Sequence, residues 1–519
     1  MIVLIAILAT VSLFVIYFLV CPVVFYVFDP KGFRKYPNYY FFSGITDLGQ
    51  CYLSACGFRS KALFEAHKNA PVIRIGPNSL SFGDIRAIRD IYGHSTKCTK
   101  DLKEVVLTGT HTHLFDVIDK SEHARKRKLL SAAFAIKNLE QWEFKVADVT
   151  GRLITALDQH CTNALPQGQL IPNPEDLTVD FNKWINLFTI EAINNIALSN
   201  RLGLLEQGSD EVTAQRPDGT PYKAPYRYCQ NQTAYGQATF VWDYKNYHWL
   251  VSLSKILPKW RKIWLDAEPW NDVVLHQATK RLQKYQAGEK LDDFFTSLME
   301  DKSGNPNFLE WGEIVAEVGA IINAGAETTA IALTQILHLL IRHPFHLTTL
   351  REELDSVLDL DEVVAPYDKV KDLPFLRACI DEGLRIIPPT SAGLPRRTPP
   401  EGTHILGEWI PGNTSVSMPI YAAHRDPEVF PEPEQFNPHR WMDLVERKRM
   451  EPYFIPFSTG ARGCIGRNIS YLEQIVVLAS LVHRYDFALS DPGWELERHE
   501  AFNLLMGEMP LKIWRRKIE

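Results

Sequence analysis

The residues of this 519-residue chain that are best suited to chemistry lie near its end, in the run Phe457-Ser-Thr-Gly-Ala-Arg-Gly-Cys-Ile-Gly466. The run combines one thiol, Cys464, and one fixed cation, Arg462, with glycines on both sides, among them Gly460 and Gly466. Glycine lets the backbone approach a flat ligand, backbone N–H groups tune a sulfur ligand, and a guanidinium pairs with carboxylates. This combination suits a thiolate that binds haem iron, whereas the plainer alternative is a buried structural cysteine in a Gly-rich turn.

A second group of reactive side chains lies in the middle of a long apolar segment, in Ala324-Gly-Ala-Glu-Thr-Thr329. The apolar positions of residues 308–342 keep a helical period, and His343-Pro344 is a stop signal. The Thr328 hydroxyl can bond the Ala324 carbonyl oxygen four residues back and open the helix locally. The result would be a small groove with a hydroxyl and the Glu327 carboxylate, able to hold dioxygen and pass it protons. The alternative is that small residues merely ease helix packing.

The two segments resemble the haem-binding signature Phe-x-x-Gly-x-Arg-x-Cys-x-Gly and the oxygen-activation motif Ala/Gly-Gly-x-Asp/Glu-Thr-Thr/Ser of the cytochrome P450 family. The resemblance implies a mainly α fold with small β-sheets and haem b (heme b, iron protoporphyrin IX) as cofactor. It makes Cys464 the axial ligand of the haem iron, and Thr328 and Glu327 the residues that deliver protons for O–O cleavage. The other residues that it places at the haem are Phe457, Gly460, Arg462 and Gly466.

Further basic residues are expected at the haem carboxylates. His123 and Arg127 lie four residues apart and therefore share one face of a predicted helix. The resemblance assigns both to the haem propionates, together with Arg396, for which Arg397 remains the alternative. Arg125, Lys126 and Lys128 are interpreted as a solvated face that could meet an acidic redox partner.

A predicted helix from Leu373 to a Pro388-Pro389 stop carries Glu382 and Arg385, which are neighbours on one face. Such spacing usually means a surface ion pair. Apolar residues recurring every four positions indicate instead a partly buried helix, where a charge must be paired. The resemblance supplies Arg440 as a further partner and makes all three residues structural.

Three other segments give clear predictions. Residues 71–82 predict a β-hairpin because β-branched alternation is broken by Gly76-Pro77. Residues 205–235 contain many Gly and Pro and predict a surface loop. Residues 469–481 predict an apolar helix whose N-terminus approaches Cys464.

The first 28 residues contain no charged side chain and are long enough to span a bilayer. The basic residues Lys31, Arg34 and Lys35 follow this stretch, which places the C-terminal side of the span in the cytosol. We therefore predict a transmembrane anchor over 1–28, a linker over 29–40 and a haem-thiolate catalytic domain over 41–519. A buried core helix is the alternative for residues 1–28.

The composition narrows the classes of protein to which the chain can belong. The apolar content of 45% and charged content of 23% are typical of a globular protein. The net charge of −6 argues against nucleic-acid binding. Eight cysteines without a C-x-x-C pair form neither a zinc pattern nor a disulfide framework.

The expected function is that of a single-pass endoplasmic reticulum monooxygenase that inserts one oxygen atom of O₂ into a lipophilic small molecule. By resemblance to fungal biosynthetic members, the substrate would be a terpenoid, polyketide or alkaloid. Electrons would come from NADPH-cytochrome P450 reductase, with cytochrome b5 as a further donor. The rivals are a haem-thiolate isomerase or dehydratase that does not need O₂, and a non-catalytic haem-binding protein.

Overall fold

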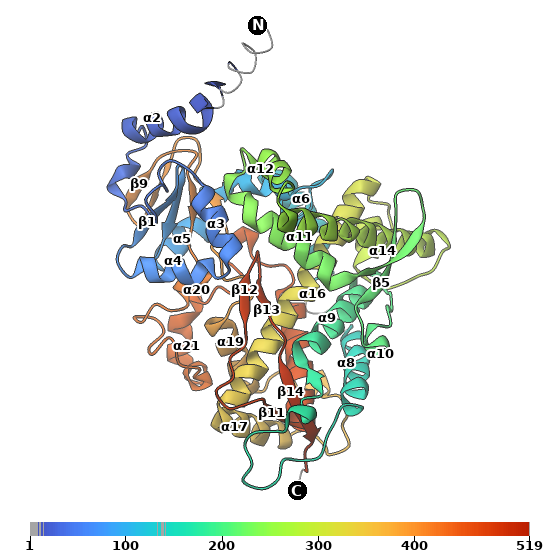
Figure 1. Cartoon of the computed structure of the whole chain (residues 1–519). Coiled ribbons are helices and arrows are strands. Elements are labelled where there is room, and N and C mark those ends of the chain that lie inside the picture. Colours follow the sequence, from blue (N-terminus) through green and yellow to red (C-terminus); the bar gives the residue numbers. More distant parts are fainter. Residues whose placement is uncertain are drawn as a thin grey trace.

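The computed structural model describes residues 9, 12–13, 15–131, 133–135, 140 and 142–517. Helices dominate and the strands are short, as the sequence predicts (Figure 1). The longer helices are α6 (Lys120–Ser131), α8 (Glu143–Asp158), α9 (Phe181–Leu198), α11 (Tyr226–Phe240), α14 (Pro269–Gln286), α16 (Trp311–Arg342), α17 (Pro344–Asp355), α19 (Pro374–Ile386) and α22 (Arg467–Arg484). The shorter helices are α2 (Cys21–Phe28), α3 (Leu48–Cys56), α4 (Arg59–His67), α5 (Ala87–Tyr92), α10 (Leu204–Gln207), α12 (Tyr247–Ser254), α13 (Pro258–Ala267), α15 (Phe294–Met299), α18 (Tyr367–Val370), α20 (Ile420–Ala423) and α21 (Leu444–Met450).

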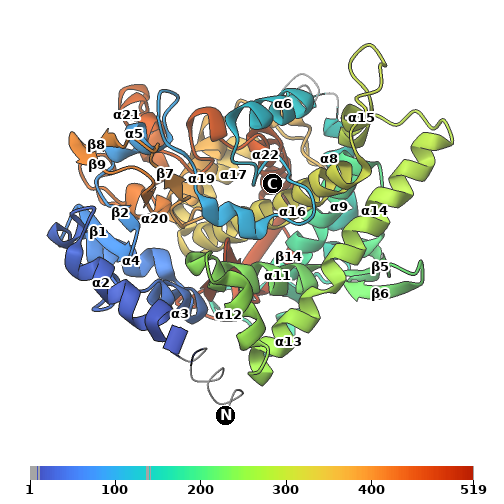
Figure 2. The same ribbon diagram turned by 90° about the horizontal axis from the view of Figure 1, so that it is seen from above.

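The largest sheet has the strand order β1-β2-β10-β7-β3. Its strands are β1 (Val72–Gly76), β2 (Ser79–Phe82), β10 (Ser415–Ser417), β7 (Arg396–Arg397) and β3 (Thr99–Lys100). The smaller sheets are formed by β11 (Tyr485–Leu489), β14 (Pro510–Arg515) and β4 (Val179–Asp180), by β12 (Arg498–Glu500) with β13 (Leu504–Met506), by β5 (Glu211–Gln215) with β6 (Pro221–Pro225), and by β8 (Thr403–Ile405) with β9 (Glu408–Ile410). Figure 2 shows the large sheet on one side of the molecule and the main helical body on the other. β1 and β2 are the hairpin that the sequence predicts over residues 71–82.

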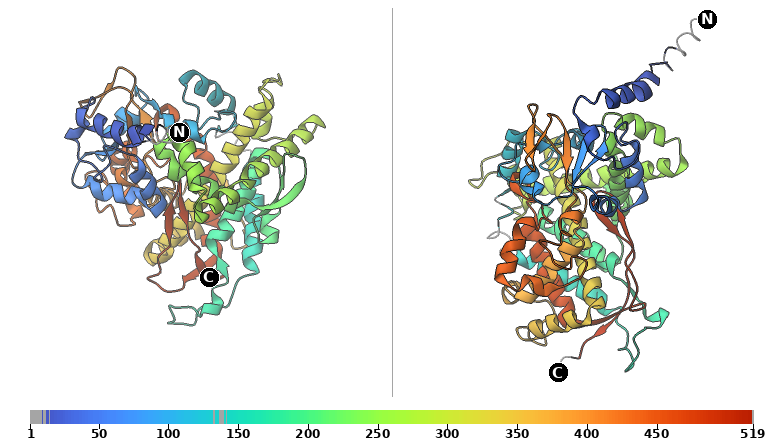
Figure 3. Two further views of the ribbon diagram at one scale, coloured as in Figure 1. Left: turned by 45° about the horizontal axis from the view of Figure 1, so that its top comes forward. Right: turned by 90° about the vertical axis from the view of Figure 1, so that its left-hand side faces the viewer.

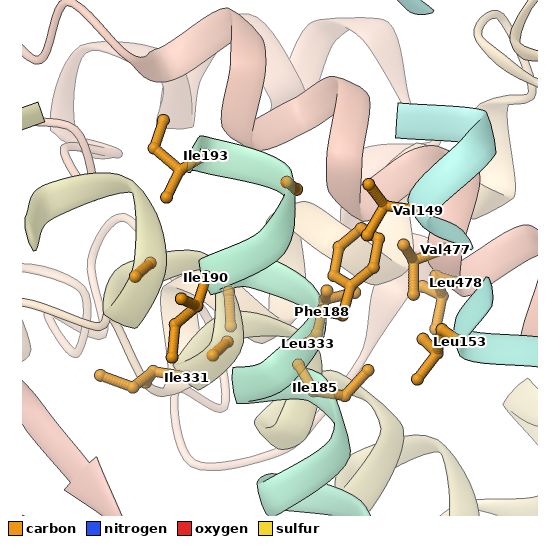
Figure 4. Packing of buried hydrophobic residues seen from close by; sticks show 14 of the residues in the cluster. Val149, Leu153, Ile185, Phe188, Ile190, Ile193, Ile331, Leu333, Val477 and Leu478 are labelled. Carbon is orange, nitrogen blue, oxygen red and sulfur yellow. The ribbon is translucent and has the colours of Figure 1, made fainter. Parts of the chain in front are cut away.

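Four helices enclose the main hydrophobic core. Apolar side chains of α8, α9, α16 and α22 interdigitate there, with Phe188 of α9 between Val149 of α8 and Leu333 of α16 (Figure 4). These side chains are almost completely buried. Because α16 runs through this core, the groups in its middle are held rigidly.

Helix α16 begins three residues later than predicted, at Trp311, and ends as predicted at Arg342. Phe308 has a φ of 52° and is highly exposed, so the helix cannot extend back through it. Within the described residues α16 is the one helix long and apolar enough to span a bilayer, but 72% of its apolar window is buried in the protein. It is therefore a core helix.

The predicted anchor over residues 1–28 falls partly outside the described residues. Its described part forms a π-helical turn (Ile16–Val20) and α2, which together make an apolar helix shorter than a membrane span. Helix α2 lies beside the large sheet, at the opposite end of the molecule from the end of β14 (Figure 3).

Residues 29–40, predicted as a linker, pack against the body. Phe33 and Tyr36 are buried in a second hydrophobic cluster beneath the large sheet. The Lys31 ammonium donates hydrogen bonds to Asn78 Oδ1 at 2.6 Å and to the Gly412 carbonyl oxygen at 2.8 Å.

The prediction of a surface loop over residues 205–235 is wrong. The segment holds the antiparallel hairpin β5–β6 and the beginning of α11. The hairpin turn contains Asp218-Gly219, with a φ of 88° at Gly219 and the Asp218 carboxylate accepting the Thr220 N–H. An Asp-Gly pair between two short strand-forming segments is a strong hairpin signal. The many other Gly and Pro residues in this segment led to the prediction of a loop instead.

Candidate active site

The Cys464 segment is a tight loop that ends at the start of α22. The Cys464 N–H donates to the Phe457 carbonyl oxygen at 2.9 Å, and the Gly463 N–H donates to the Gly460 carbonyl oxygen at 3.0 Å. Gly460 has a φ of 72°, and a Cβ there would lie 2.1 Å from the Tyr92 carbonyl oxygen. Only glycine readily adopts this positive φ and also has no Cβ that would collide with the Tyr92 carbonyl oxygen.

The Cys464 sulfur keeps solvent-accessible surface although many protein atoms surround it, as expected of a group that faces an internal cleft. Burial raises the pKa of this thiol, whereas the backbone N–H groups of Gly466 and Arg467 and the charge of Arg127 lower it. The Arg127 guanidinium also donates to the Gly463 carbonyl oxygen at 2.6 Å. The loop therefore supplies donors and positive charge that stabilise a thiolate.

A cluster of cationic side chains lies beside this loop. Arg462 donates to the carbonyl oxygens of Val117 and Ile118, and its pKa is lowered to about 10 by burial and by the charge of Arg396. Within the described residues, neither of these arginines has a carboxylate at salt-bridge distance, and the same is true of Arg127. Partly buried cations without an ionic partner fit a ligand with carboxylate groups, such as the two propionates of haem.

His123 belongs to the same cluster. It is buried on α6, and its pKa is lowered to about 4 by burial and by the charges of Arg462, Arg127, Lys100 and Arg396. At neutral pH it is therefore uncharged and can donate one neutral hydrogen bond.

The two candidate arginines of β7 have different surroundings. The Arg396 side chain is buried, with its guanidinium carbon 5.1 Å from the centre of the Tyr92 ring. Arg397 is half-buried and donates to Asn413 Oδ1 at 3.2 Å. The structure brings Arg396, and not Arg397, next to Arg462.

Lys100 was not identified from the sequence. It is buried on β3, directly opposite Arg396 in the register, with its Nζ 3.4 Å from Glu104 Oε1. Burial lowers its pKa to about 8. Nothing local marks this lysine, because only the pairing of β3 with β7 brings it to the cluster.

The predicted hydrogen bond in the middle of α16 is present. Thr328 Oγ1 donates to the Ala324 carbonyl oxygen at 2.8 Å. Asn323 and Ala324 are exposed and Thr328 is half-buried, whereas Ile322 and Ala326 beside them are buried. This pattern indicates an internal cleft along this part of α16.

Gly325 has a packing reason as well. A Cβ at this position would lie 2.5 Å from Cγ1 of Ile193 on α9, so a larger residue would push the two helices apart. The packing alternative of the sequence analysis therefore holds for this glycine.

The Glu327 carboxyl is buried and is held by a residue that the sequence analysis did not single out. Asn503 Nδ2 donates to Glu327 Oε2 at 2.9 Å, and Thr390 Oγ1 donates to Asn503 Oδ1 at 2.9 Å. Burial raises the pKa of Glu327, while the Asn503 bond and the charge of Arg227 lower it. No sequence signal marks Asn503, because it is 176 residues away along the chain.

Thr329, the second threonine of the motif, connects α16 to α22. Its hydroxyl lies 3.1 Å from the Ser470 hydroxyl, and Gln474 Nε2 donates to the latter at 2.9 Å. The adjacent Glu473 carboxyl is buried and bonded to Thr329, with Oε1 lacking a partner. Burial raises its pKa to about 8.

Glu382 is the centre of a buried ion network. Arg385 donates to both of its carboxylate oxygens at 2.8 Å, Arg440 Nε to one at 3.0 Å, and Trp441 Nε1 to the other at 2.9 Å. Burial opposes the charge of Glu382, but the two arginines hold its pKa below the usual value. These residues form one network, which joins α19 to the segment that precedes the Cys464 loop.

The prediction of a solvated basic face on α6 is wrong for Lys126. Its side chain is 2% exposed, and its ammonium bonds Glu313 and Glu317 of α16 at 2.6 and 3.0 Å. Arg125 forms ion pairs with Glu122 and Glu313. Among the described residues, no carboxylate pairs with Lys128, the third residue of this face. Long-range pairing, invisible in the sequence, neutralises the other two.

Two aromatic side chains from segments far apart in the sequence pack against each other. Phe115 and Phe502 meet edge to face with ring centres 5.6 Å apart. The loop that carries Phe115 is tied to α16, because the Leu114 N–H donates to Glu317 Oε2 at 3.1 Å. An apolar pair of this kind suits a lipophilic ligand.

Comparison of the chain with known proteins identifies its family. The cytochrome P450 family model matches residues 73–514. Benzoate 4-monooxygenase bphA of Aspergillus niger is 30% identical over 86% of each chain, and a cytochrome P450 monooxygenase of Aspergillus terreus is 30% identical over 81% of this chain and 83% of its own. Tryprostatin B 6-hydroxylase of Aspergillus fumigatus is 25% identical over 88% of this chain and 76% of its own. The chain therefore belongs to the cytochrome P450 family and is a monooxygenase, an oxidoreductase that incorporates oxygen into its substrate.

Proposed function

We propose that this protein binds haem b through Cys464 and inserts one oxygen atom of O₂ into a C–H or C=C bond of a lipophilic small molecule, with the other atom reduced to water. The observation that carries the proposal is the cluster of unpaired cations beside the Cys464 sulfur. This set of side chains offers a thiolate and several cations without carboxylate partners, and haem has an iron that binds a thiolate and two propionates that pair with cations.

The binding roles follow from the surroundings of each residue. Cys464 would ligate the iron, with the N–H groups of Gly466 and Arg467 directed at its sulfur. His123, Arg396 and Arg462 would hold the propionates, and Lys100 joins them. Arg127 would stabilise the loop through the Gly463 carbonyl oxygen. Phe457, Gly460 and Gly466 would shape the loop, and the Glu382–Arg385–Arg440 network would fix the segment behind it.

Haem with a thiolate ligand supplies the oxidant, because the sulfur pushes electron density toward O–O cleavage. The chain supplies positions and protons. The Thr328 hydroxyl would turn away from the Ala324 carbonyl oxygen to donate its one proton to the site of oxygen activation, and the buried Glu327 carboxyl would replace that proton. The raised pKa of Glu327 favours this role, because an acid that holds its proton nearer neutral pH is a better donor.

Electrons would come from NADPH through NADPH-cytochrome P450 reductase, with cytochrome b5 as a further donor. The sequence contains no Gly-rich nucleotide-binding fingerprint of its own, which supports a separate flavoprotein.

Membrane attachment through the N-terminal segment, in the endoplasmic reticulum with a cytosolic catalytic domain, is part of the proposal. Exposed apolar side chains on α2, on α12 and on the segments near them support it, because water does not favour such a surface. They are Val23, Phe25, Phe28, Phe41, Phe42, Trp249, Leu253, Ile256 and Leu257. α2 and α12 lie at the same end of the molecule (Figures 1 and 2).

The Phe115–Phe502 pair and the relatives support a lipophilic substrate. The similar proteins include a benzoate 4-monooxygenase and a tryprostatin B 6-hydroxylase. A lipophilic secondary metabolite of fungal type, such as a terpenoid, polyketide or alkaloid, fits both.

The test uses microsomes that contain the full chain and a reductase. NADPH and candidate substrates are added, and products are examined for a mass gain of one oxygen atom, with Cys464→Ser as control. We expect a thiolate-type carbon-monoxide difference spectrum and oxygenated product from the wild type, and neither from the variant. An isomerised or dehydrated product formed without NADPH would contradict the proposal.

A further inference from the structure

Two neutral amide side chains face each other beside the oxygen-activation groove. Gln230 on α11 donates through Nε2 to the side-chain oxygen of Asn323 on α16, and to the Asn323 backbone carbonyl oxygen at 3.2 Å. The neighbouring Tyr226 hydroxyl donates to the Ile322 carbonyl oxygen at 3.3 Å, so the two helices are held together here. The pair is thus a fixed feature of the site.

This bond leaves two hydrogen-bonding groups unused. Among the described residues none accepts a hydrogen bond from Asn323 Nδ2, and none donates one to Gln230 Oε1. Asn323 is exposed although it lies in the middle of a helix that crosses the core. The bonded pair therefore has one donor and one acceptor left over, on Asn323, which is exposed, and on Gln230, which is buried.

We propose that Asn323 and Gln230 together bind an amide group of the substrate, which makes the substrate class a lipophilic molecule with an N–H and a C=O on the same side, as in a lactam. The substrate carbonyl oxygen accepts from Asn323 Nδ2, and the substrate N–H donates to Gln230 Oε1. The inference rests on the proposed function, since it assigns a substrate class to that same cleft.

The charges nearby favour a neutral group over an acid. Asn323 and Glu327 lie four residues apart and share one face of α16, so a bound carboxylate would lie near the Glu327 carboxyl. Arg227, one helical turn before Gln230, lies close enough to Glu327 for the two charges to attract each other, and it donates to the Met506 carbonyl oxygen at 3.4 Å. Its charge is thereby partly balanced by Glu327.

The position of the pair also sets which end of the substrate is oxidised. Asn323 precedes Thr328 by five residues, which is about 7.5 Å along the helix axis. An amide held at Asn323 therefore keeps the amide end away from Thr328 and presents the apolar end to the site of oxygen activation.

The test is a spectral titration of the full-length holoenzyme with three molecules of nearly equal shape. They are 3,4-dihydroquinolin-2(1H)-one, which has both groups, 3,4-dihydrocoumarin, which has only the carbonyl, and tetralin, which has neither. We expect the wild type to bind the lactam about thirtyfold more tightly than tetralin, and dihydrocoumarin about fivefold more tightly, because each net hydrogen bond contributes about 1 kcal/mol.

In Asn323→Leu and in Gln230→Leu, which each leave one of the two hydrogen bonds, the preference for the lactam should fall to about fivefold, while tetralin binds at least as tightly as before. Gln232→Leu is the matched control, because Gln232 lies on the same helix and its side chain makes no hydrogen bond with the described residues. It should keep the wild-type preference.

The inference is overturned if the wild type does not prefer the lactam, or shifts with none of the three molecules. Tighter binding of 3-phenylpropanoic acid than of the lactam would overturn it too, and would assign the site to acids. A thiolate-type carbon-monoxide spectrum recorded on each sample shows separately whether the proposed haem-thiolate function stands.

Discussion

The side-chain amide of Asn503 donates a hydrogen bond of 2.9 Å to the Glu327 carboxyl, and so holds a buried acid next to Thr328 in the chain. This bond opposes the effect of burial, because it favours the ionised form of the acid. In Asn503→Leu the pKa of Glu327 should therefore rise further, and the falling limb of the pH–rate profile, where a proton donor loses its proton, should move to higher pH. Product formed per NADPH consumed should fall several-fold, as measured with reconstituted reductase.

Thr390→Val is the matched control for that variant. It removes only the outer hydrogen bond, from Thr390 to Asn503, and should have a smaller effect on both readings. An unchanged pH profile in Asn503→Leu would show that this asparagine only packs beside Glu327.

Removing the Thr328 hydroxyl should uncouple the reaction. In Thr328→Ala the bond to the Ala324 carbonyl oxygen is lost, together with the hydroxyl that delivers protons to the cleft. NADPH consumption should continue while the product yield falls by roughly tenfold or more, with hydrogen peroxide taking its place. Thr328→Ser keeps the hydroxyl and should retain most of the coupling. Full coupling in the alanine variant would refute the role of Thr328.

The ion network at Glu382 should be essential for folding. Glu382→Ala leaves Arg385 and Arg440 near each other without their carboxylate, which should cost about 3–5 kcal/mol in the free energy of unfolding. Denaturant unfolding and haem content of the purified protein measure the effect. Glu446→Ala, which breaks an exposed pair with Arg449, should change stability by less than about 0.5 kcal/mol. A Glu382→Ala protein with wild-type stability would contradict this account.

Glu473 should make stability depend on pH in an unusual direction. Its folded pKa is raised to about 8, so between the unfolded value and pH 8 the unfolded chain loses a proton that the folded chain keeps. This group therefore destabilises the fold as the pH rises through that window. Glu473→Gln should leave stability at pH 5 nearly unchanged and increase it at pH 8 by about 1–3 kcal/mol.

Thermal unfolding of both proteins across pH 5 to 8 gives the measurement. A stability difference that is the same at the two ends of the range would mean that Glu473 does not titrate there. Glu495→Gln is a suitable control, because that carboxyl is exposed and its pKa is lowered by Arg342.

Local patterns were sufficient for part of this structure. The Thr328–Ala324 hydrogen bond, the bounds of α19 and the stop after Arg342 follow from side chains close together in sequence. The resemblance to cytochrome P450s likewise needed only short segments, and the family match confirms it.

The residues that escaped prediction depend on distant parts of the chain. Lys100 reaches the cation cluster through pairing of β3 with β7, and Asn503 meets Glu327 through the return of the chain after β12. Lys126 looked solvated because its carboxylate partners on α16 lie almost 190 residues away. Such contacts are set by tertiary packing, which no local periodicity encodes.

The Lys31 ammonium, held by Asn78 and the Gly412 carbonyl oxygen, gives the start of the chain a mechanical role. Phe33, two residues later, is buried in the body. The segment that joins the apolar helix α2 to the catalytic body is therefore fixed in place and does not act as a flexible hinge. A surface that binds α2 would therefore also determine how the whole enzyme is oriented relative to that surface.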